Sequence, residues 1–162
     1  MDPVPTLTEA AVRTFGGLCG STYLNRGFEA FLDRRFRGYE LEFYDELKPY
    51  MMTEFDKNIK KRFMGVEDEK FTILVLGIPD NYHLGISRGK LTISGRDLKP
   101  IFSEVMACII RLVRAQIDAT TKNVKKILLG GGFGQSGYLR AELQKAMRSD
   151  GRKVDVANIW HR

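Results

Sequence analysis

The segment VKKILLGGGFGQSGYLRAELQKAM, residues 124–147, constrains the fold of this chain more than any other stretch. An apolar run over 124–129 predicts a strand, and the pattern over 138–147 predicts an amphipathic helix. Four of the five positions over 130–134 are glycine. A tight turn needs only one or two glycines, so this number favours a backbone that approaches a ligand or another segment closely. Ser136 opens the following helix, whose free N–H groups can bind an anion or a ring acceptor.

The stretch GFGQSG, residues 132–137, also matches the G-x-G-x-x-G fingerprint of dinucleotide-binding proteins. An acidic residue, Asp155, follows at about the expected separation. That fingerprint normally lies in the first strand–helix–strand unit of a larger sheet, whereas here it comes near the end of the sequence. Dinucleotide binding is therefore the less favoured alternative.

The rest of the chain alternates helical and strand patterns, which predicts an α/β fold. The longest expected helix has Asp97 as its N-cap and Pro100 in its first turn, where proline is tolerated. In chain order the other expected elements are a strand over 6–15, a helix over 22–37, a helix that follows Pro49, a strand over 71–78, and two short strands over 84–93 that are divided by an Arg-Gly turn, before the long helix over 98–117.

Charge and cysteine content exclude several classes of partner. The net charge is +6, but the basic residues are scattered over several expected helices rather than gathered in one aromatic-interleaved stripe, so no nucleic-acid partner is predicted. No apolar run approaches the ~18 residues of a membrane span, so no membrane partner is predicted. Cys19 and Cys108 lie among apolar residues without metal-ligand spacing. They predict reduced thiols and a cytoplasmic protein.

Four segments, in order along the chain, resemble the heat-shock protein 70 family, whose ATPase domain has the actin-like fold. KKILLGGGFGQSGYLRAEL resembles the adenosine-binding turn of that family. GGLCGSTYLNRGFEAFL resembles the glycine turn and first helix of the upper half of lobe II, and FDKNIKKRF resembles the helix that flanks the adenine. LGISRGKLTISGRDLKPIF resembles the meander and return helix. The GGLCGST and GGFGQS variants look most like the divergent heat-shock-70-like chaperone relatives of filamentous fungi.

The resemblance implies an α/β fold, a ribonuclease H-like lobe II of an actin-like ATPase with an inserted α+β subdomain. The lower half of the lobe would consist of residues 1–18 and 97–162 and would carry the adenosine turn. The inserted upper subdomain would span residues 19–96. By this comparison the chain is expected to be truncated to most of lobe II.

The resemblance also implies a binding site for ATP or ADP. Asp56 and Lys60 are four residues apart, so they share a helix face and would contact the ribose hydroxyls and the base edge. Lys57 or Lys61 could be the contact instead of Lys60, and an exposed ion pair worth about 0.2–0.5 kcal/mol would explain the spacing without a ligand. The other implied contacts are Gly131, Gly132 and Phe133 along the adenosine, Gln135 where the family often has a basic residue that stacks on the base, and Gly20 and Ser21 on the far side of the ribose.

Phosphoryl transfer needs more than this half of a cleft, namely a phosphate cradle, acidic side chains that hold Mg²⁺ and a positioned water. In the family these come from two glycine-rich hairpins that carry an aspartate, and this sequence holds no D-x-G-[TG] hairpin. We therefore predict no catalytic residue, no metal ligand and no ATP hydrolysis by this chain alone, with Mg²⁺ bound only if the missing lobe is supplied.

Two functions follow as hypotheses. The first is weak binding of adenine nucleotide by a heat-shock-70-like ATPase lobe. The alternative is a nucleotide-independent interaction module that binds a co-chaperone, as exchange factors bind in the family, or associates with itself.

Overall fold

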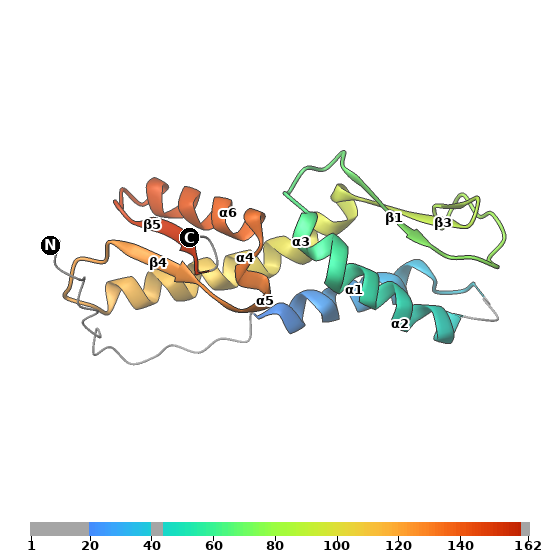
Figure 1. The fold of residues 1–162 in the computed structure, drawn as a ribbon, viewed down its shortest axis with the longest axis horizontal. Helices are drawn as coiled ribbons and strands as arrows, with labels where there is room; N and C mark the ends of the chain where they lie inside the picture. Colours follow the sequence, from blue (N-terminus) through green and yellow to red (C-terminus); the bar gives the residue numbers. More distant parts are fainter. Residues whose placement is uncertain (1–19, 40–43, 160–162) are drawn as a thin grey trace, which may run out of the picture.

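The computed structural model describes residues 20–39 and 44–159 (Figure 1). It is a mixed α/β structure, in agreement with the expected class, and its sheets are small. The strand expected over 6–15 lies outside the described residues. The elements are α1 (Ser21–Arg35), α2 (Tyr44–Glu54), the π-helical turn η1 (Phe55–Ile59), α3 (Lys60–Arg62), β1 (Lys70–Leu74), β2 (Ile86–Ser87), β3 (Lys90–Ser94), α4 (Gly95–Asp118), β4 (Lys126–Leu129), α5 (Gly131–Gly134), α6 (Gly137–Ser149) and β5 (Asp155–Asn158).

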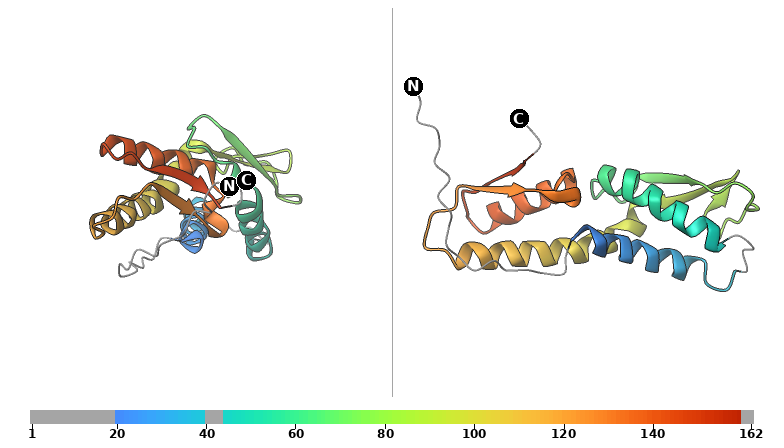
Figure 2. Two further views of the ribbon diagram at one scale, coloured as in Figure 1. Left: turned by 60° about the vertical axis from the view of Figure 1, so that its left-hand side comes forward. Right: turned by 60° about the horizontal axis from the view of Figure 1, so that its bottom comes forward.

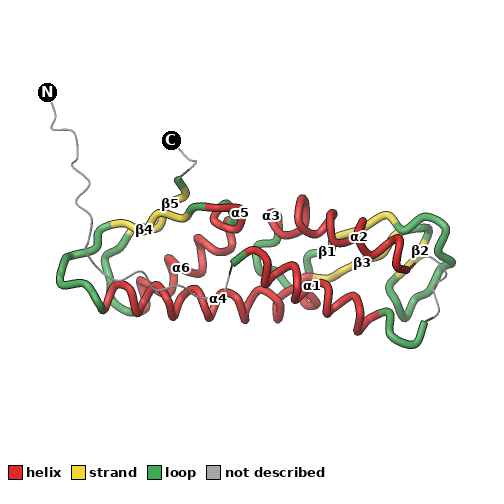
Figure 3. Tube along the Cα trace, turned by 90° about the horizontal axis from the view of Figure 1, so that it is seen from below, coloured by secondary structure: helices red, strands yellow, loops and turns green. Residues whose placement is uncertain are grey.

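The molecule is elongated, and α4 runs along most of its length (Figures 1 and 3). At one end of α4 lie α1, α2, η1, α3 and an antiparallel sheet, and at the other end lie β4, β5, α5 and α6. Helix α1 packs against the first half of α4, where Gly27 lies so close to Ile101 that a β-carbon at position 27 would stand 2.7 Å from the Ile101 Cγ2 atom. The right-hand view of Figure 2 shows α1 and α4 along the same side of the molecule, with both sheets on the other.

The antiparallel sheet has the strand order β1-β3-β2. The pairs Phe71–Ile93 and Ile73–Leu91 lie on its buried face. Its β2–β3 turn is the expected Arg-Gly pair, with positive φ angles of 51° at Arg88 and 68° at Gly89. Positive φ at both central residues is the conformation that matches the twist of a two-residue hairpin, so this prediction is confirmed.

The predicted N-cap of α4, Asp97, is wrong by three residues. Ser94 is the N-cap, and its Oγ accepts a hydrogen bond from the Asp97 backbone N–H at 3.2 Å. The Asp97 carboxylate accepts in return from the Ser94 backbone N–H at 2.9 Å. This reciprocal pair is a capping box, in which an acidic residue at the third helical position acts with the cap rather than as the cap.

Helix α2 begins at Tyr44, before Pro49, although the sequence predicted a start after that proline. Packing on α1 explains the difference. The Tyr44 ring lies 5.1 Å from the ring of Phe36, and its hydroxyl donates to Asp33 at 2.9 Å. Lys48 also forms an ion pair with Asp33 at 2.9 Å. These contacts hold the turn that precedes Pro49 in helical form, against the local preference of proline.

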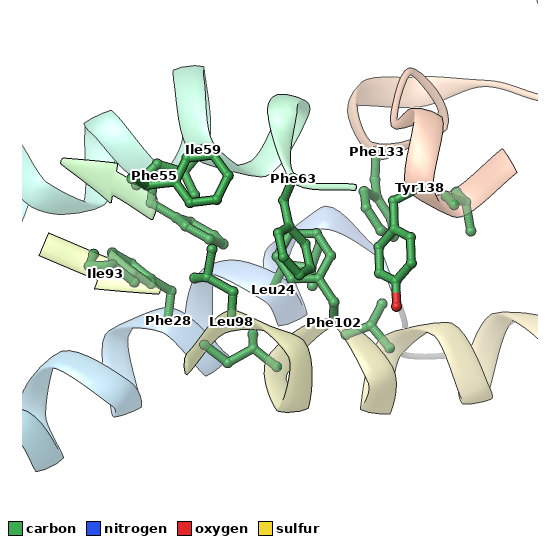
Figure 4. Packing of buried hydrophobic residues seen from close by; sticks show 14 of the residues in the cluster. Leu24, Phe28, Phe55, Ile59, Phe63, Ile93, Leu98, Phe102, Phe133 and Tyr138 are labelled. Carbon is green, nitrogen blue, oxygen red and sulfur yellow. The ribbon is translucent and has the colours of Figure 1, made fainter. Parts of the chain in front are cut away.

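An aromatic core links the two ends of the molecule (Figure 4). Phe28 of α1 stacks on Phe55 of η1, with ring centroids 4.1 Å apart. The Phe63 ring lies 4.6 Å from that of Phe102 on α4 and 5.3 Å from that of Tyr138 on α6. The position of α6 relative to α3 and α4 therefore depends on ring-to-ring packing, which stabilises beyond the area that it buries.

The second sheet pairs β4 with β5 in parallel, with Leu129 opposite Asn158. The side chain of Gln144 on α6 binds the outer edge of β5, because its Nε2 donates to the Val154 carbonyl and its Oε1 accepts from the Val156 N–H, both at 2.9 Å. Ser136 is the N-cap of α6, as expected, and accepts from the Leu139 N–H at 3.2 Å.

One thiol prediction is wrong. Cys108 on α4 is disulfide-bonded rather than reduced, so it gives no support to a cytoplasmic location. Within residues 20–39 and 44–159, no helix combines the length and the apolar character that are needed to cross a membrane.

Candidate functional site

The glycine turn connects β4 to α5, and its glycines have different reasons to be glycine. Gly131 has a φ of +76°, which L side chains rarely adopt. A β-carbon at position 134 would lie 3.0 Å from the carbonyl carbon of Leu129, so the fold also restricts that position. Position 132 has neither constraint, since its φ is ordinary and its nearest neighbour would be Ser21 Oγ at 4.0 Å. The fold itself does not require glycine at position 132. Its exposed backbone is therefore open to a ligand.

Ser21, at the start of α1, connects this turn to a polar cluster between α1 and η1. The Lys60 ammonium donates to Ser21 Oγ at 2.6 Å, to Asn25 Oδ1 at 3.0 Å and to Asp56 Oδ1. Asn25 Nδ2 also donates to Asp56 Oδ1, at 3.2 Å. We call these four residues, Ser21, Asn25, Asp56 and Lys60, the polar cluster.

The polar cluster has a buried end and an open end. The Lys60 side chain is only 5% exposed, whereas that of Asp56 is 49% exposed. An ammonium group has three N–H donors, and each finds an acceptor in the cluster. The Oδ2 atom of Asp56 accepts no hydrogen bond from the described part of the chain. The Asp56 Oδ2 atom is therefore left to accept hydrogen bonds from outside, whereas all three donors of the Lys60 ammonium are bound within the cluster.

A π-helical turn places Asp56 and Lys60 in this arrangement. The Lys60 backbone N–H donates to the Phe55 carbonyl, five residues back, instead of the usual four. Single π turns inside α-helices are rare and occur frequently at functional sites. Lys57 and Lys61 are both exposed, so Lys60 is the lysine that this turn brings to Asp56 and α1.

The polar cluster keeps Asp56 ionised. The hydrogen bond from Lys60 lowers the pKa of Asp56 below its ordinary value, and the hydrogen bond from Asn25 adds to that effect, while partial burial opposes it. The site therefore presents a carboxylate, which can only accept hydrogen bonds, in a cluster whose Ser21 hydroxyl is the neighbour of the glycine turn.

The other predicted contact residues differ in how exposed they are to solvent. Gly20 is exposed, immediately before α1, and a β-carbon there would have no neighbour within 4 Å. Gln135 is exposed at the end of α5. The Phe133 ring is buried instead, 6.1 Å from the ring of Phe102 (Figure 4), so only its backbone is available to a ligand.

Sequence reasoning missed Asn25. It lies four residues after Ser21 on the same face of α1, and that spacing was the available signal. A separate groove of about 670 Å³ lies between α1 and α4, lined by residues that include Tyr23, Arg26 and Arg111. None of the predicted contact residues lines it.

No three His, Cys, Asp or Glu side chains among residues 20–39 and 44–159 gather where they could hold a metal ion. Comparison with known proteins adds no assignment, because no family model, no curated protein and no solved structure matches the chain.

Proposed function

We propose that this chain is a lobe of a heat-shock-70-like, actin-like ATPase that binds the nucleoside end of ATP or ADP. The observation that carries the proposal is the meeting of the glycine turn with the polar cluster, where Gly132 and Ser21 are neighbours. Residues far apart in the sequence come together here: Lys60, which is buried, binds Ser21 and Asp56, and Ser21 is the neighbour of Gly132. These are four of the positions to which the family resemblance assigns nucleotide contacts.

The chemistry of the site suits a ribose. A ribose carries two vicinal hydroxyl groups, and each can donate a hydrogen bond. The free Oδ2 atom of Asp56 is an acceptor for them, and charge-assisted hydrogen bonds of this kind are roughly twice as strong as neutral ones. The side-chain-free backbone at Gly132 allows the flat face of a base to lie against the turn.

In this proposal Lys60 is a positioning residue. Its donors are used by Ser21, Asn25 and Asp56, so it holds the carboxylate in place and ionised rather than binding the ligand itself. Gln135, exposed beside the turn, is the side chain available to cover the base. These residues would contact only the ribose and the base. We therefore expect similar affinity for ATP, ADP and adenosine, and no ATP hydrolysis by this chain alone.

Thermal unfolding with added ligand tests the proposal. A site with a dissociation constant near ~1 mM gains about 1.4 kcal/mol of stability at ~10 mM ligand. For a domain of this size that corresponds to a rise in Tm of about 3–6 °C. We expect this rise with ATP, ADP and adenosine, and no rise with ribose 5-phosphate or with phosphate alone.

A matched pair of variants separates the site from general effects. Gly132→Leu fills the open space before the turn, whereas Ala141→Leu adds a leucine at an exposed position of α6. Both variants should fold, and only Gly132→Leu should lose the ligand-dependent rise in Tm.

A rise with NADH but not with adenosine would replace the proposal by dinucleotide binding. A cooperative melt that no nucleotide shifts would refute nucleotide binding and leave the interaction module. Leu128, which is 58% exposed on β4, is the surface residue that favours that second function.

A further inference from the structure

Strand β1 has a free edge that is ready for pairing. Val75 N–H donates to the Gly89 carbonyl at 2.8 Å, and on β3 Thr92 N–H donates toward β2, to the Gly85 carbonyl at 2.9 Å. Backbone groups alternate in direction along an antiparallel strand. The N–H and C=O groups of Thr72 and Leu74 therefore point away from the sheet, and no backbone hydrogen bond reaches them from the described residues.

After Lys70, the first residue of β1, this edge carries no further charge, proline or glycine up to Leu76. Residues 71–76 read FTILVL. Leu74 is 50% exposed and Leu76 is 76% exposed. Native proteins protect free edges with charges, prolines, bulges or a covering element, and here β5 is covered by Gln144. The edge of β1 is thus a template for another strand.

A polar stripe on the neighbouring helix borders the same edge. Glu54, Asn58 and Arg62 are spaced four apart, and they line a groove of about 180 Å³ together with Lys70 and Thr72. Asn58 Nδ2 donates to Glu54 Oε2 at 2.7 Å, and the Arg62 guanidinium lies 5.9 Å from the centre of the Phe71 ring. The stripe therefore has an anion at one end, an amide at its centre and a cation at the other end.

We propose that a second copy of this chain pairs its β1 antiparallel along this edge and so forms a two-fold symmetric dimer with one continuous six-stranded sheet. A two-fold axis brings the same patch of both copies together in opposite directions. The stripe then matches itself, with Glu54 of each copy facing Arg62 of the other and the two Asn58 side chains meeting near the axis. The dimer covers Leu74 and Leu76 of both copies.

The charge pattern favours a second copy over an unrelated strand. When residues 71–76 pair antiparallel with their copy, an uncharged run lies against an uncharged run, and the two Lys70 side chains are not opposed. The same axis that pairs the strands gives opposite charges at both ends of the stripe. This inference is independent of nucleotide binding, since the glycine turn and the polar cluster contribute no residue to the interface.

Light scattering after size exclusion, over roughly micromolar to ~100 µM protein, tests the inference. We expect twice the monomer mass for the unmodified chain at the upper concentrations. Leu74→Lys places a charge in the interface and should give a monomer. Its thermal melt should equal that of the unmodified chain at concentrations where that chain is also monomeric, because Leu74 is half exposed in the single copy. Leu128→Lys, at an exposed leucine of β4, is the matched control and should remain dimeric.

Charge reversal keeps the inference testable if Leu74→Lys disturbs folding. Glu54→Arg and Arg62→Glu should each weaken the dimer, on the order of tenfold, because each creates two like-charge contacts. The double variant should restore the original affinity. A monomer at all concentrations, a dimer lost with Leu128→Lys but kept with Leu74→Lys, or a double variant no better than the single ones would overturn the proposal.

Discussion

Removing either partner of the Asp56–Lys60 pair should destabilise the protein, but by unequal amounts. The pair joins a side chain that is 5% exposed to one that is 49% exposed. Asp56→Ala leaves the Lys60 ammonium buried with only the neutral acceptors Ser21 and Asn25. Lys60→Met leaves a carboxylate that water already reaches, and the methionine fills most of the space of the lysine stem. The exposed partner should therefore matter more to stability than the buried one.

The magnitudes follow from the group that is left behind. Breaking a buried pair so that a charge stays buried costs about 3–5 kcal/mol, and the two remaining acceptors place Asp56→Ala near ~3 kcal/mol. For Lys60→Met the carboxylate is partly screened by solvent, so the loss should be about 1–2 kcal/mol. The neighbouring exposed lysine gives the control, because Lys61→Met should stay within about 0.5 kcal/mol of the unmodified chain.

Urea unfolding measures these differences from the transition midpoints, provided that the slope with urea is unchanged. The expected order of stability is the unmodified chain and Lys61→Met first, then Lys60→Met, then Asp56→Ala. Lys60→Met as the least stable variant would refute this reasoning. It would mean that the three hydrogen bonds of the Lys60 ammonium stabilise the fold by more than it costs to leave that charge buried without Asp56.

Three further perturbations test other parts of the structure. The pKa of Asp56 is lower in the folded chain than the ordinary aspartate value of 3.8, so its pair with Lys60 stabilises the fold fully above that pH. This stabilisation is lost as the pH falls through the lower pKa of the folded state. The urea midpoints at pH 6 and pH 3 should therefore differ less for Lys60→Met than for the unmodified chain. Gly95→Ala should destabilise by about 3 kcal/mol or more, because its β-carbon would overlap the Val66 carbonyl oxygen, and a Tm within ~2 °C of the unmodified chain would contradict this. Phe102→Ala should cost about 3–5 kcal/mol and broaden or split the thermal melt, since Phe102 links the two ends of the molecule; a single sharp transition at the original Tm would argue against that role.

Local patterns were sufficient for several elements. The helix over 22–37 corresponds to α1, the Arg-Gly turn divides β2 from β3, and Ser136 caps α6, because each depends on residues within a few positions of one another. The cap of α4 was misplaced because Ser94 and Asp97 both satisfy the local signal, and only the reciprocal hydrogen bonds distinguish them. The short helix α5 was missed, since glycines predict a turn and not a helix.

The candidate site was predictable only in part. The i, i+4 spacing of Asp56 and Lys60 indicated a shared helix face, but it left Lys57 and Lys61 as open alternatives. The π-helical turn brings Lys60, rather than Lys57 or Lys61, to Asp56, and no local sequence pattern indicates such a turn. Phe133 lies in the predicted turn, yet its ring is part of the core. Packing against the Phe102 ring stabilises the fold more than exposing the Phe133 ring to water would.

By itself the sequence determined what depends on neighbours along the chain, namely the periodicity of the helices, the strand before the glycines and the glycine positions that require special backbone conformations. Only the tertiary structure decided that the start of α1, the π-helical turn and the glycine turn share one surface, and that the edge of β1 lies beside a helix stripe of matching charge. The physical reason is that these juxtapositions arise from the packing of Phe28, Phe55, Phe63 and Phe102 between distant elements, and no local pattern records which buried ring will meet which.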